Sequence, residues 1–298
     1  MISTTDQMRA RANAQRREAC RRAMLKTFVR AALLFSIVPI GLTVVYGFEA
    51  PNAIGDYLSQ IHSGFDLVGF PYRLLPQSAG LSQYGDLLLD RIEFVRFYLN
   101  SIGYALAIAA GQVVIGAMAA YALTCFRFRI SNWIFGLYIL LMILPFQVTM
   151  VPNFIMLSRL RLIDTAYALT LPGLFAPFSV FLFRQYMTTL PSALIEAGTI
   201  DGAHSGHIFG LIILPICKPA VCACAMLGLS ESWNMLEQPL VLLKSARLYP
   251  LSLALVDGGY VDASVQFAAA TLYMLPMLLF FLYFQQDIVT GIQIADLK

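Results

Sequence analysis

Charged residues are scarce in this chain, and their scarcity excludes a water-soluble globular protein. Only 12% of the 298 residues are charged, whereas an average soluble domain has roughly 25%. The deficit takes the form of long uncharged stretches at 31–48, 97–126, 130–158, 165–183 and 263–286. Each stretch is about long enough to cross a lipid bilayer.

Histidine and cysteine are also few, with three and five residues respectively. Four of the cysteines fall in or beside the apolar stretches, where a thiol behaves as a small hydrophobic group. Cys217, Cys222 and Cys224 lack the second Cys pair of a structural zinc site, and His204 and His207 lack a third ligand nearby. The sequence therefore predicts neither a disulfide framework nor a metal site.

The common catalytic motifs are missing from the sequence. It contains no G-x-S-x-G, no H-E-x-x-H and no pair of carboxylates inside an apolar stretch. The phosphate-binding motif G-x-x-x-x-G-K-[ST] is absent as well. An intramembrane enzyme thus has no candidate catalytic set, and any ATP must be bound by another chain.

The apolar segments predict an all-α, polytopic membrane protein. At roughly 20 residues per crossing, we expect six membrane helices at 27–48, 97–124, 133–157, 165–187, 211–233 and 264–286. Lys218 interrupts the fifth, close enough to one end for its ammonium to reach the interface. Asn100 and Gln112 are expected to hydrogen-bond between helices. The expected organisation is a basic tail over residues 1–26, followed by a transmembrane domain over residues 27–298.

The N-terminal tail is strongly basic and predicts the membrane orientation. Eight basic residues precede or enter the first span, against two acidic ones: Arg9, Arg11, Arg16, Arg17, Arg21, Arg22, Lys26 and Arg30, against Asp6 and Glu18. The positive-inside rule places this end in the cytoplasm, and six crossings return the C-terminus there. A cleaved signal peptide is disfavoured because the apolar run 31–48 exceeds the usual 7–15 residues. The tail is expected to contact anionic lipid rather than nucleic acid, because aromatic residues are not interspersed in it.

A polar segment at residues 190–209 separates the fourth and fifth expected spans, and it is longer than a passive connector needs. Pro191 suits a first helical position, residues 192–200 are compatible with a helix, and Gly202 suits a left-handed turn before a second short helix. Glu196 and its small neighbours would fit the groove of another protein. A helix lying at the membrane interface explains these residues equally well.

Several motifs resemble a known family. Glu196-Ala197-Gly198, Asp201-Gly202-Ala203 and Leu214-Pro215 resemble the EAA loop of binding-protein-dependent ABC importer permeases. The carbohydrate-type, maltose-permease-like subgroup is suggested by Leu144-Pro145-Phe146-Gln147, Leu162-Ile163-Asp164-Thr165, Phe183-Arg184-Gln185 and Trp233-Asn234. Gly198 replaces the second Ala of the EAA motif. After Trp233-Asn234, this chain has Met235-Leu236 where an acidic residue and Phe are usual in the family. The resemblance covers roughly residues 27–298.

The resemblance implies the fold of a type I ABC importer permease with cytoplasmic coupling helices. Such a chain is one permease half of an importer in the bacterial inner membrane and translocates a carbohydrate or polyol without catalysing a reaction. The implied ATPase contacts are Glu196, Ala197, Gly198, Asp201, Gly202 and Ala203.

The implied partners are a second permease subunit, two copies of a cytoplasmic subunit that holds ATP and Mg, and an extracytoplasmic solute-binding protein. No cofactor is expected on this chain, and no nucleic acid is an expected partner. A permease for glycerol phosphate is the alternative. A channel or secondary transporter acting alone is disfavoured, because intramembrane acids and inverted repeats are not apparent.

Polar residues inside membrane spans are the default candidates for a translocation path. Gln147 lies between Pro145 and Pro152, which free backbone carbonyls that suit a water-filled path. Glu231, Trp233 and Asn234 cluster at the outer end of the fifth span, where an aromatic ring beside polar groups suits a sugar. An interfacial Trp anchor is the alternative there. By resemblance, the outer segment 235–262 includes a loop that enters the solute-binding protein.

Overall fold

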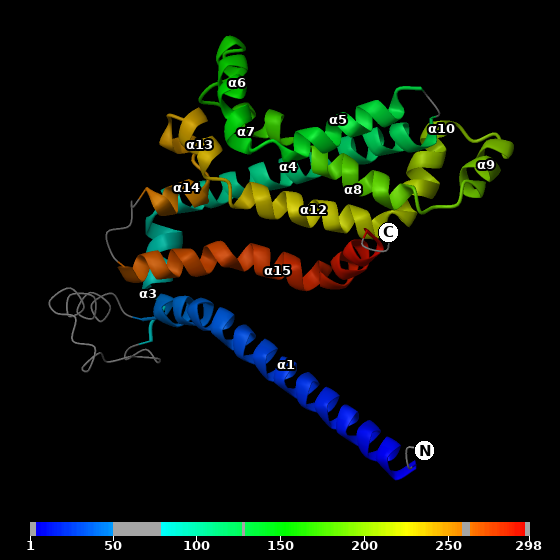
Figure 1. The fold of residues 1–298 in the computed structure, drawn as a ribbon. Coiled ribbons are helices and arrows are strands. Elements are labelled where there is room, and N and C mark those ends of the chain that lie inside the picture. The colour runs from blue at the N-terminus through cyan, green and yellow to red at the C-terminus, as the bar shows by residue number, and fades with distance from the viewer. Residues whose placement is uncertain (1–3, 50–78, 127–128, 258–262, 296–298) are drawn as a thin grey trace. The chain divides into compact units, whose positions relative to one another are not determined.

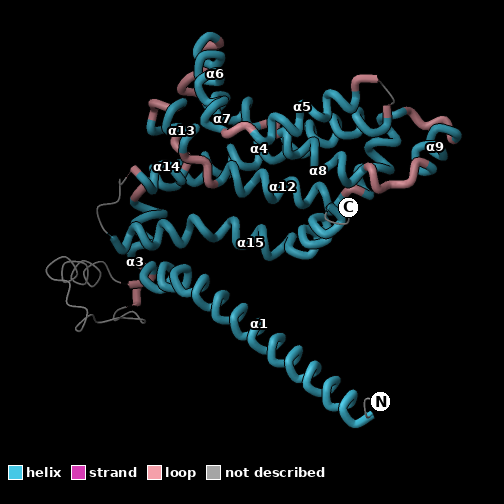
Figure 2. Tube along the Cα trace, in the orientation of Figure 1, coloured by secondary structure: helices cyan, strands magenta, loops and turns pink. Residues whose placement is uncertain are grey.

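The computed structural model describes residues 4–49, 79–126, 129–257 and 263–295. These residues are almost entirely helical (Figure 1, Figure 2), and an isolated antiparallel bridge joins Glu49 to Ala79. They fall into two compact units, one drawn from residues 1–83 with 262–271 and one from 84–261 with 272–298. Residues 1–3 of the expected tail and 258–262 of the expected outer segment lie outside the described residues.

The first unit is dominated by one long helix, α1 (Thr4–Gly47). Its section Arg21–Gly47 is long and apolar enough to cross a membrane, and large apolar side chains such as Phe35 are exposed along it, as lipid contact requires. The helix runs without a break through residue 26, where the basic tail was expected to give way to the transmembrane domain. Near its end, the Gln83 amide donates to the carbonyls of Gly47 and Glu49, at 2.9 Å each.

The second unit is a helical bundle. Its elements, in chain order, are α3 (Ser82–Gly85, shared with the first unit), the π-helix η1 (Asp86–Asp90), α4 (Ile92–Cys125), α5 (Ser131–Ile143), α6 (Phe146–Arg159), α7 (Ala166–Gly173), α8 (Pro177–Met187), α9 (Ala193–Ile200), α10 (Ser205–His207), the π-helix η2 (Ile208–Ile213), α11 (Leu214–Ile216), α12 (Lys218–Trp233), α13 (Glu237–Leu242), the 3-10 turn η3 (Ala246–Leu248), α14 (Leu251–Val256) and, from residue 272 onward, α15 (Ala263–Ala295).

These elements place two regions at opposite ends of the bundle (Figure 1). Helix α4 packs against α8 and α12, and α5 packs against α8. Helices α9 and α10 lie at one end, and α6 and α13 lie at the other. The candidate functional residues are divided between these two ends.

The described part of the chain has four helical segments that are long and apolar enough to span a membrane, or up to six if each of two bent pairs counts as one. The expected third span is bent: α5 and α6 meet at 102°, because Pro145 lacks a backbone N–H and Leu144 before it is extended. The fifth expected span is also broken, since the segments Ser205–Ile216 and Lys218–Trp233 meet at 79°.

Glycines let α4 approach its neighbours closely. A Cβ atom on Gly116 would lie 2.5 Å from Ser179 Oγ, and one on Gly228 would lie 2.4 Å from Gln112 Oε1. The Gln112 amide donates to the Gly173 carbonyl at 3.0 Å, so its expected role between helices is confirmed. Small residues and interhelical amide bonds are the usual means of packing helices in lipid.

Candidate coupling segment and translocation path

The polar segment at residues 190–209 forms the predicted helix, turn and second helix. Helix α9 begins at Ala193 with Ser192 as its N-cap, so Pro191 precedes the cap and does not occupy the first helical position as expected. Glu196 lies in the first turn, where the helix dipole favours a negative charge. The segment is positioned at one end of the bundle (Figure 1).

The turn after α9 requires glycine, as the sequence predicts. Gly202 has φ +76°, and its N–H donates to the Thr199 carbonyl at 3.1 Å. The Ala203 N–H donates to the Gly198 carbonyl at 2.9 Å. These two bonds form a Schellman motif, in which a left-handed residue ends the helix and satisfies its last carbonyls. His204 then caps α10 by accepting the Gly206 N–H on Nδ1 at 3.1 Å.

The six expected coupling residues divide into an outer and an inner set. Glu196, Ala197, Asp201 and Gly202 are exposed, whereas Gly198 is buried and Ala203 is half-buried. A Cβ atom on Gly198 would lie 3.1 Å from Ile208 Cγ1, so glycine allows α9 to sit close to η2. Ile200, which the sequence analysis did not single out, is 85% exposed and adds an apolar group to the outer set.

Tyr121 joins this segment to the long helix α4. Its hydroxyl donates to the Ser205 carbonyl at 3.3 Å, and its ring lies 5.1 Å from that of Phe209. Ile208 and Ile213 are buried in the same apolar cluster as Tyr121. Tyr121 of α4 therefore contacts both α10 and η2.

At the other end of the bundle, Gln147 is hydrogen-bonded to Glu237. Gln147 is the second residue of α6 and Glu237 is the first of α13, and both side chains are exposed. Gln147 Nε2 lies 3.1 Å from Glu237 Oε2 and 3.3 Å from Oε1. Glu237 was not predicted as a site residue from the sequence. The sequence feature that could have indicated it is a carboxylate within an apolar segment, three residues after Trp233-Asn234.

Trp233 is an internal residue of this chain. Its side chain is 3% exposed; its ring stacks on Tyr273 at 5.4 Å and meets the edge of Tyr98 at 5.9 Å. The indole N–H donates to the Tyr273 carbonyl at 3.2 Å. An indole enclosed in this way does not offer a ring face for stacking on a sugar.

The two other candidates of this cluster, Glu231 and Asn234, are exposed. The Tyr273 hydroxyl lies 2.8 Å from Asn234 Oδ1 and 3.1 Å from the Trp233 carbonyl. Hydrogen bonds therefore join Trp233 and Asn234 to α15, and Gln147 to α13.

A clasp that the sequence analysis did not predict connects two loops at the same end as α6. Asp164 has φ +61°, and its carboxylate accepts hydrogen bonds from Lys244 and Ser245. Bonds from the Ser245 hydroxyl, the Ser245 N–H and the Lys244 N–H lower the pKa of Asp164 below its ordinary value. The residue had been noted only as part of the family resemblance.

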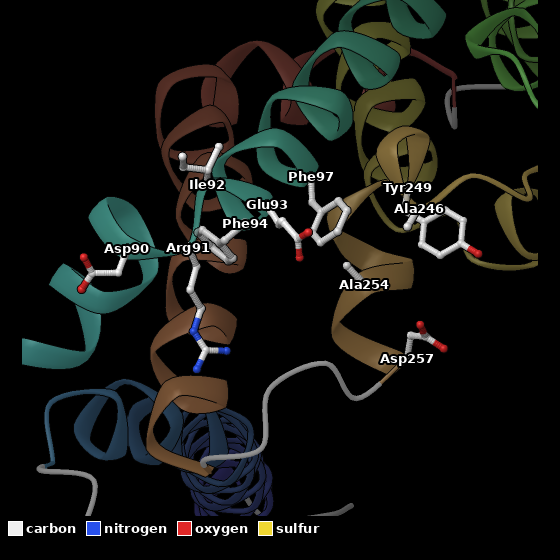
Figure 3. Close-up of a pocket in the computed structure, with 10 residues that line it drawn as sticks. All are labelled: Asp90, Arg91, Ile92, Glu93, Phe94, Phe97, Ala246, Tyr249, Ala254 and Asp257. Carbon is white, nitrogen blue, oxygen red and sulfur yellow. The ribbon is translucent and has the colours of Figure 1, made fainter.

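A cavity of about 550 Å³ lies at the start of α4. Figure 3 shows Glu93 and Phe97 of α4 on one side of it and Tyr249 and Asp257 on the other. Its walls combine aromatic rings with carboxylates, and the guanidinium of Arg91 lies nearby. This cavity was not predicted, because its walls come from segments that are distant in the chain.

The fold and this segment define a class: an all-helical membrane bundle that exposes a helix, a glycine turn and a second helix at one end. The family model described as "Binding-protein-dependent transport system inner membrane component" matches residues 112–289. The chain belongs to this family, and the resemblance seen in its motifs is confirmed.

Curated relatives agree with the family. The arabinooligosaccharides transport system permease protein AraQ of Halalkalibacterium halodurans is 32% identical over 86% of this chain and 95% of its own length. The sn-glycerol-3-phosphate transport system permease protein UgpE of Pectobacterium atrosepticum is 30% identical over 90% and 96%. AraQ of Bacillus subtilis is 29% identical over 78% and 83%.

A solved structure supports the fold. It is a bacterial ABC transporter involved in the import of the acidic polysaccharide alginate, and a chain of it matches with a TM-score of 0.73 at 21% identity. The match covers 96% of this chain and 98% of that chain. The protein is therefore a multi-pass inner-membrane permease subunit of an ABC importer. It binds no cofactor, and ATP is hydrolysed by a separate chain.

Proposed function

We propose that this chain is one of two different permease subunits in an importer for a carbohydrate or polyol, with both termini in the cytoplasm. The observation that carries this proposal is the similarity to AraQ of Halalkalibacterium halodurans over nearly the full length of both chains. The basic residues before the first span support the orientation. The remaining partners would be two ATP-binding subunits and an extracytoplasmic solute-binding protein.

In the proposed mechanism, the exposed residues Glu196, Ala197, Asp201 and Gly202 dock in a cleft of the ATPase. Gly198 and Ala203 seat the segment on η2 and the bundle. Closure of the ATP-binding subunits moves α9, and the bond from Tyr121 to Ser205 carries this movement to α4. ATP drives the cycle only if the ATPase dimer binds the two states of the permease with different affinity.

We propose that the exposed side chains of Gln147, Glu231 and Asn234 line the translocation path. Exposed polar side chains in a membrane protein favour a water-filled path over lipid. Trp233 serves this path indirectly, because its buried ring and its bond to Tyr273 hold the end of α12.

A second candidate solute is glycerol 3-phosphate. The similarity to UgpE of Pectobacterium atrosepticum covers 90% of this chain and favours it. This alternative keeps the same partners and the same coupling segment. The two candidate solutes differ in charge, because glycerol 3-phosphate is an anion and a carbohydrate or polyol is uncharged.

Co-purification tests the proposed partners. The tagged chain is expressed with its neighbouring genes, extracted in mild detergent, and its partners are identified by mass spectrometry. Wild type should recover an ATPase, a second permease and a solute-binding protein, and Glu196→Lys should lose the ATPase through charge reversal in the docking segment. Glu93→Lys, a charge reversal at an exposed residue in the first turn of α4, should retain the ATPase. The proposal would be contradicted if the wild-type chain purified alone. It would also be contradicted if the Glu196→Lys complex kept its ATPase.

A further inference from the structure

The Gln147 and Glu237 side chains form an exposed carboxylate–amide pair at the end of the bundle opposite α9. Both oxygens of Glu237 lie within 3.3 Å of the Gln147 amide nitrogen. An amide is uncharged, so this partner orients the carboxylate without neutralising it. The pair therefore combines a fixed negative charge with groups that donate and accept hydrogen bonds.

Two amide residues and an aromatic residue lie near the pair. A cavity of about 10 Å³ is lined by residues next to the pair in the chain, Phe146 and Gln238, together with Met150, Asn153, Pro172 and Leu242. Amide and carboxylate oxygens accept sugar hydroxyls, and ring faces pack on sugar C–H groups. A carboxylate is costly in lipid, so its exposure favours a position facing water.

The basic residues of this region are directed elsewhere or lie at a distance. Arg159 ends α6, twelve residues after Gln147, or about 18 Å along the helix at 1.5 Å per residue. That separation exceeds the screening length of about 10 Å at 0.1 M salt. Lys244, the next basic residue after α13, lies beside the carboxylate of Asp164. Among the described residues, Glu237 supplies the charge at the pair itself.

Resting on the proposed permease function, we propose that Glu237, oriented by Gln147, selects uncharged polyhydroxylated solutes and excludes phosphate esters. A phosphate monoester carries about −1.5 to −2 charges at neutral pH. Repulsion at contact distance from a carboxylate reduces its occupancy at least about tenfold relative to an uncharged solute of the same shape. Glu237 is thus a specificity-determining residue at the outer end of the path.

The charge of this site can be measured on the assembled importer without any solute. Leu240 is 65% exposed and lies three residues after Glu237, on the same helix face. The rates at which the Leu240→Cys importer reacts with two methanethiosulfonates, the cationic aminoethyl and the anionic sulfonatoethyl reagent, are compared. The importer without this cysteine serves as the blank. Each rate is divided by the rate of the same reagent with free cysteine. The cationic reagent should react roughly tenfold faster. Adding Glu237→Gln should remove this preference, and adding Glu93→Gln, at an exposed carboxylate in the first turn of α4, should leave it.

Equal rates with the two reagents, or a preference that survives Glu237→Gln, would overturn the proposal. Failure of both reagents to react would overturn it too, because the pair would then not face water. Glu237→Gln has the same shape and keeps an acceptor for Gln147, so assembly should be retained and can be checked by co-purification.

Uptake by the complete importer tests the solute class. Proteoliposomes are offered labelled neutral oligosaccharides and polyols, including arabinotriose and glycerol, together with their phosphate esters. Uptake confined to neutral members supports the proposal. Uptake of a phosphate ester by wild type overturns it while leaving the permease function intact. Uptake of no member of the panel overturns the proposed function as well, so the two failures are distinct.

Discussion

The carboxylate of Asp164 accepts hydrogen bonds from the backbone N–H groups of Lys244 and Ser245, at 2.8 Å each. The Ser245 hydroxyl donates to the same carboxylate at 2.5 Å, and the Asp164 N–H donates to the Leu242 carbonyl at 2.9 Å. The loop between α6 and α7 is thereby fixed to the loop after α13. Since α13 begins with Glu237, this clasp helps to hold the residue that we propose selects the solute.

The clasp should make the stability of these loops depend on pH. Hydrogen bonds to the ionised carboxylate lower the pKa of Asp164 below its ordinary value of 3.8. A lowered pKa means that the stabilisation is complete above about pH 4 and is lost as the pH falls through the lowered value. We expect the difference in melting temperature between wild type and Asp164→Gly to be constant from pH 7 to about pH 5 and to shrink below pH 4.

Asp164→Asn is the matched control for this experiment. Asparagine tolerates the left-handed conformation at φ +61° and keeps one acceptor oxygen, but it does not titrate. Its melting temperature should lie between those of wild type and Asp164→Gly. The difference between Asp164→Asn and Asp164→Gly should not change between pH 5 and pH 3. A wild-type advantage that grows on acidification would show that the carboxylate is not the stabilising group.

Gly202→Ala should weaken the coupling segment through the backbone alone. A left-handed conformation costs an alanine about 1–2 kcal/mol, and the space around Gly202 is open, with nothing within 4 Å of an added Cβ. Co-purification of the ATPase should fall several-fold. Gly210→Ala also meets open space, in η2, and has no positive φ, so it should retain wild-type association. Equal losses in both variants would mean that the turn conformation is not the cause.

Gly116→Ala should destabilise the bundle by about 1–3 kcal/mol, the usual cost of overpacking. The added methyl group would lie 2.8 Å from Ser179 Cβ and 3.2 Å from its backbone carbonyl carbon, which cannot move away without shifting α8. Gly103→Ala on the same helix meets nothing within 4 Å and should be neutral or slightly stabilising. Reversible unfolding in detergent compares the two, and similar free energies of unfolding would contradict the packing of α4 on α8.

Local sequence patterns predicted the features of this protein that depend on neighbouring residues. Uncharged stretches gave the helical membrane fold, and the Asp201-Gly202 turn gave the end of α9. Pairs distant in sequence were not predictable in this way. Gln147 and Glu237 are 90 residues apart, and Asp164 and Ser245 are 81 apart.

Angles and burial that depend on packing could not be predicted from the sequence either. The presence of Pro145 indicated freed carbonyls, but the size of the angle between α5 and α6, 102°, did not follow from it. The residues around Trp233 suit both a sugar site and an interfacial Trp anchor. Only the positions of Tyr98 and Tyr273, on α4 and α15, distinguish them.

The enclosure of Trp233 leads to a prediction that separates stability from transport. Trp233→Ala removes a buried ring from between Tyr98 and Tyr273 and should cost about 3–5 kcal/mol of unfolding free energy. Trp233→Phe keeps a ring but loses the 3.2 Å bond to the Tyr273 carbonyl, for a cost of about 1 kcal/mol plus lost packing. Tyr273→Phe, which removes the hydroxyl beside Asn234 Oδ1, should cost about 1 kcal/mol.

If Trp233 acts only through packing, the two conservative variants should transport with an unchanged KM for the solute, and their loss of uptake should follow the amount of folded importer in the membrane. Unfolding in detergent and uptake normalised to folded protein measure the two quantities separately. A Trp233→Phe importer of normal stability with a raised KM would contradict a role for the indole that is confined to packing.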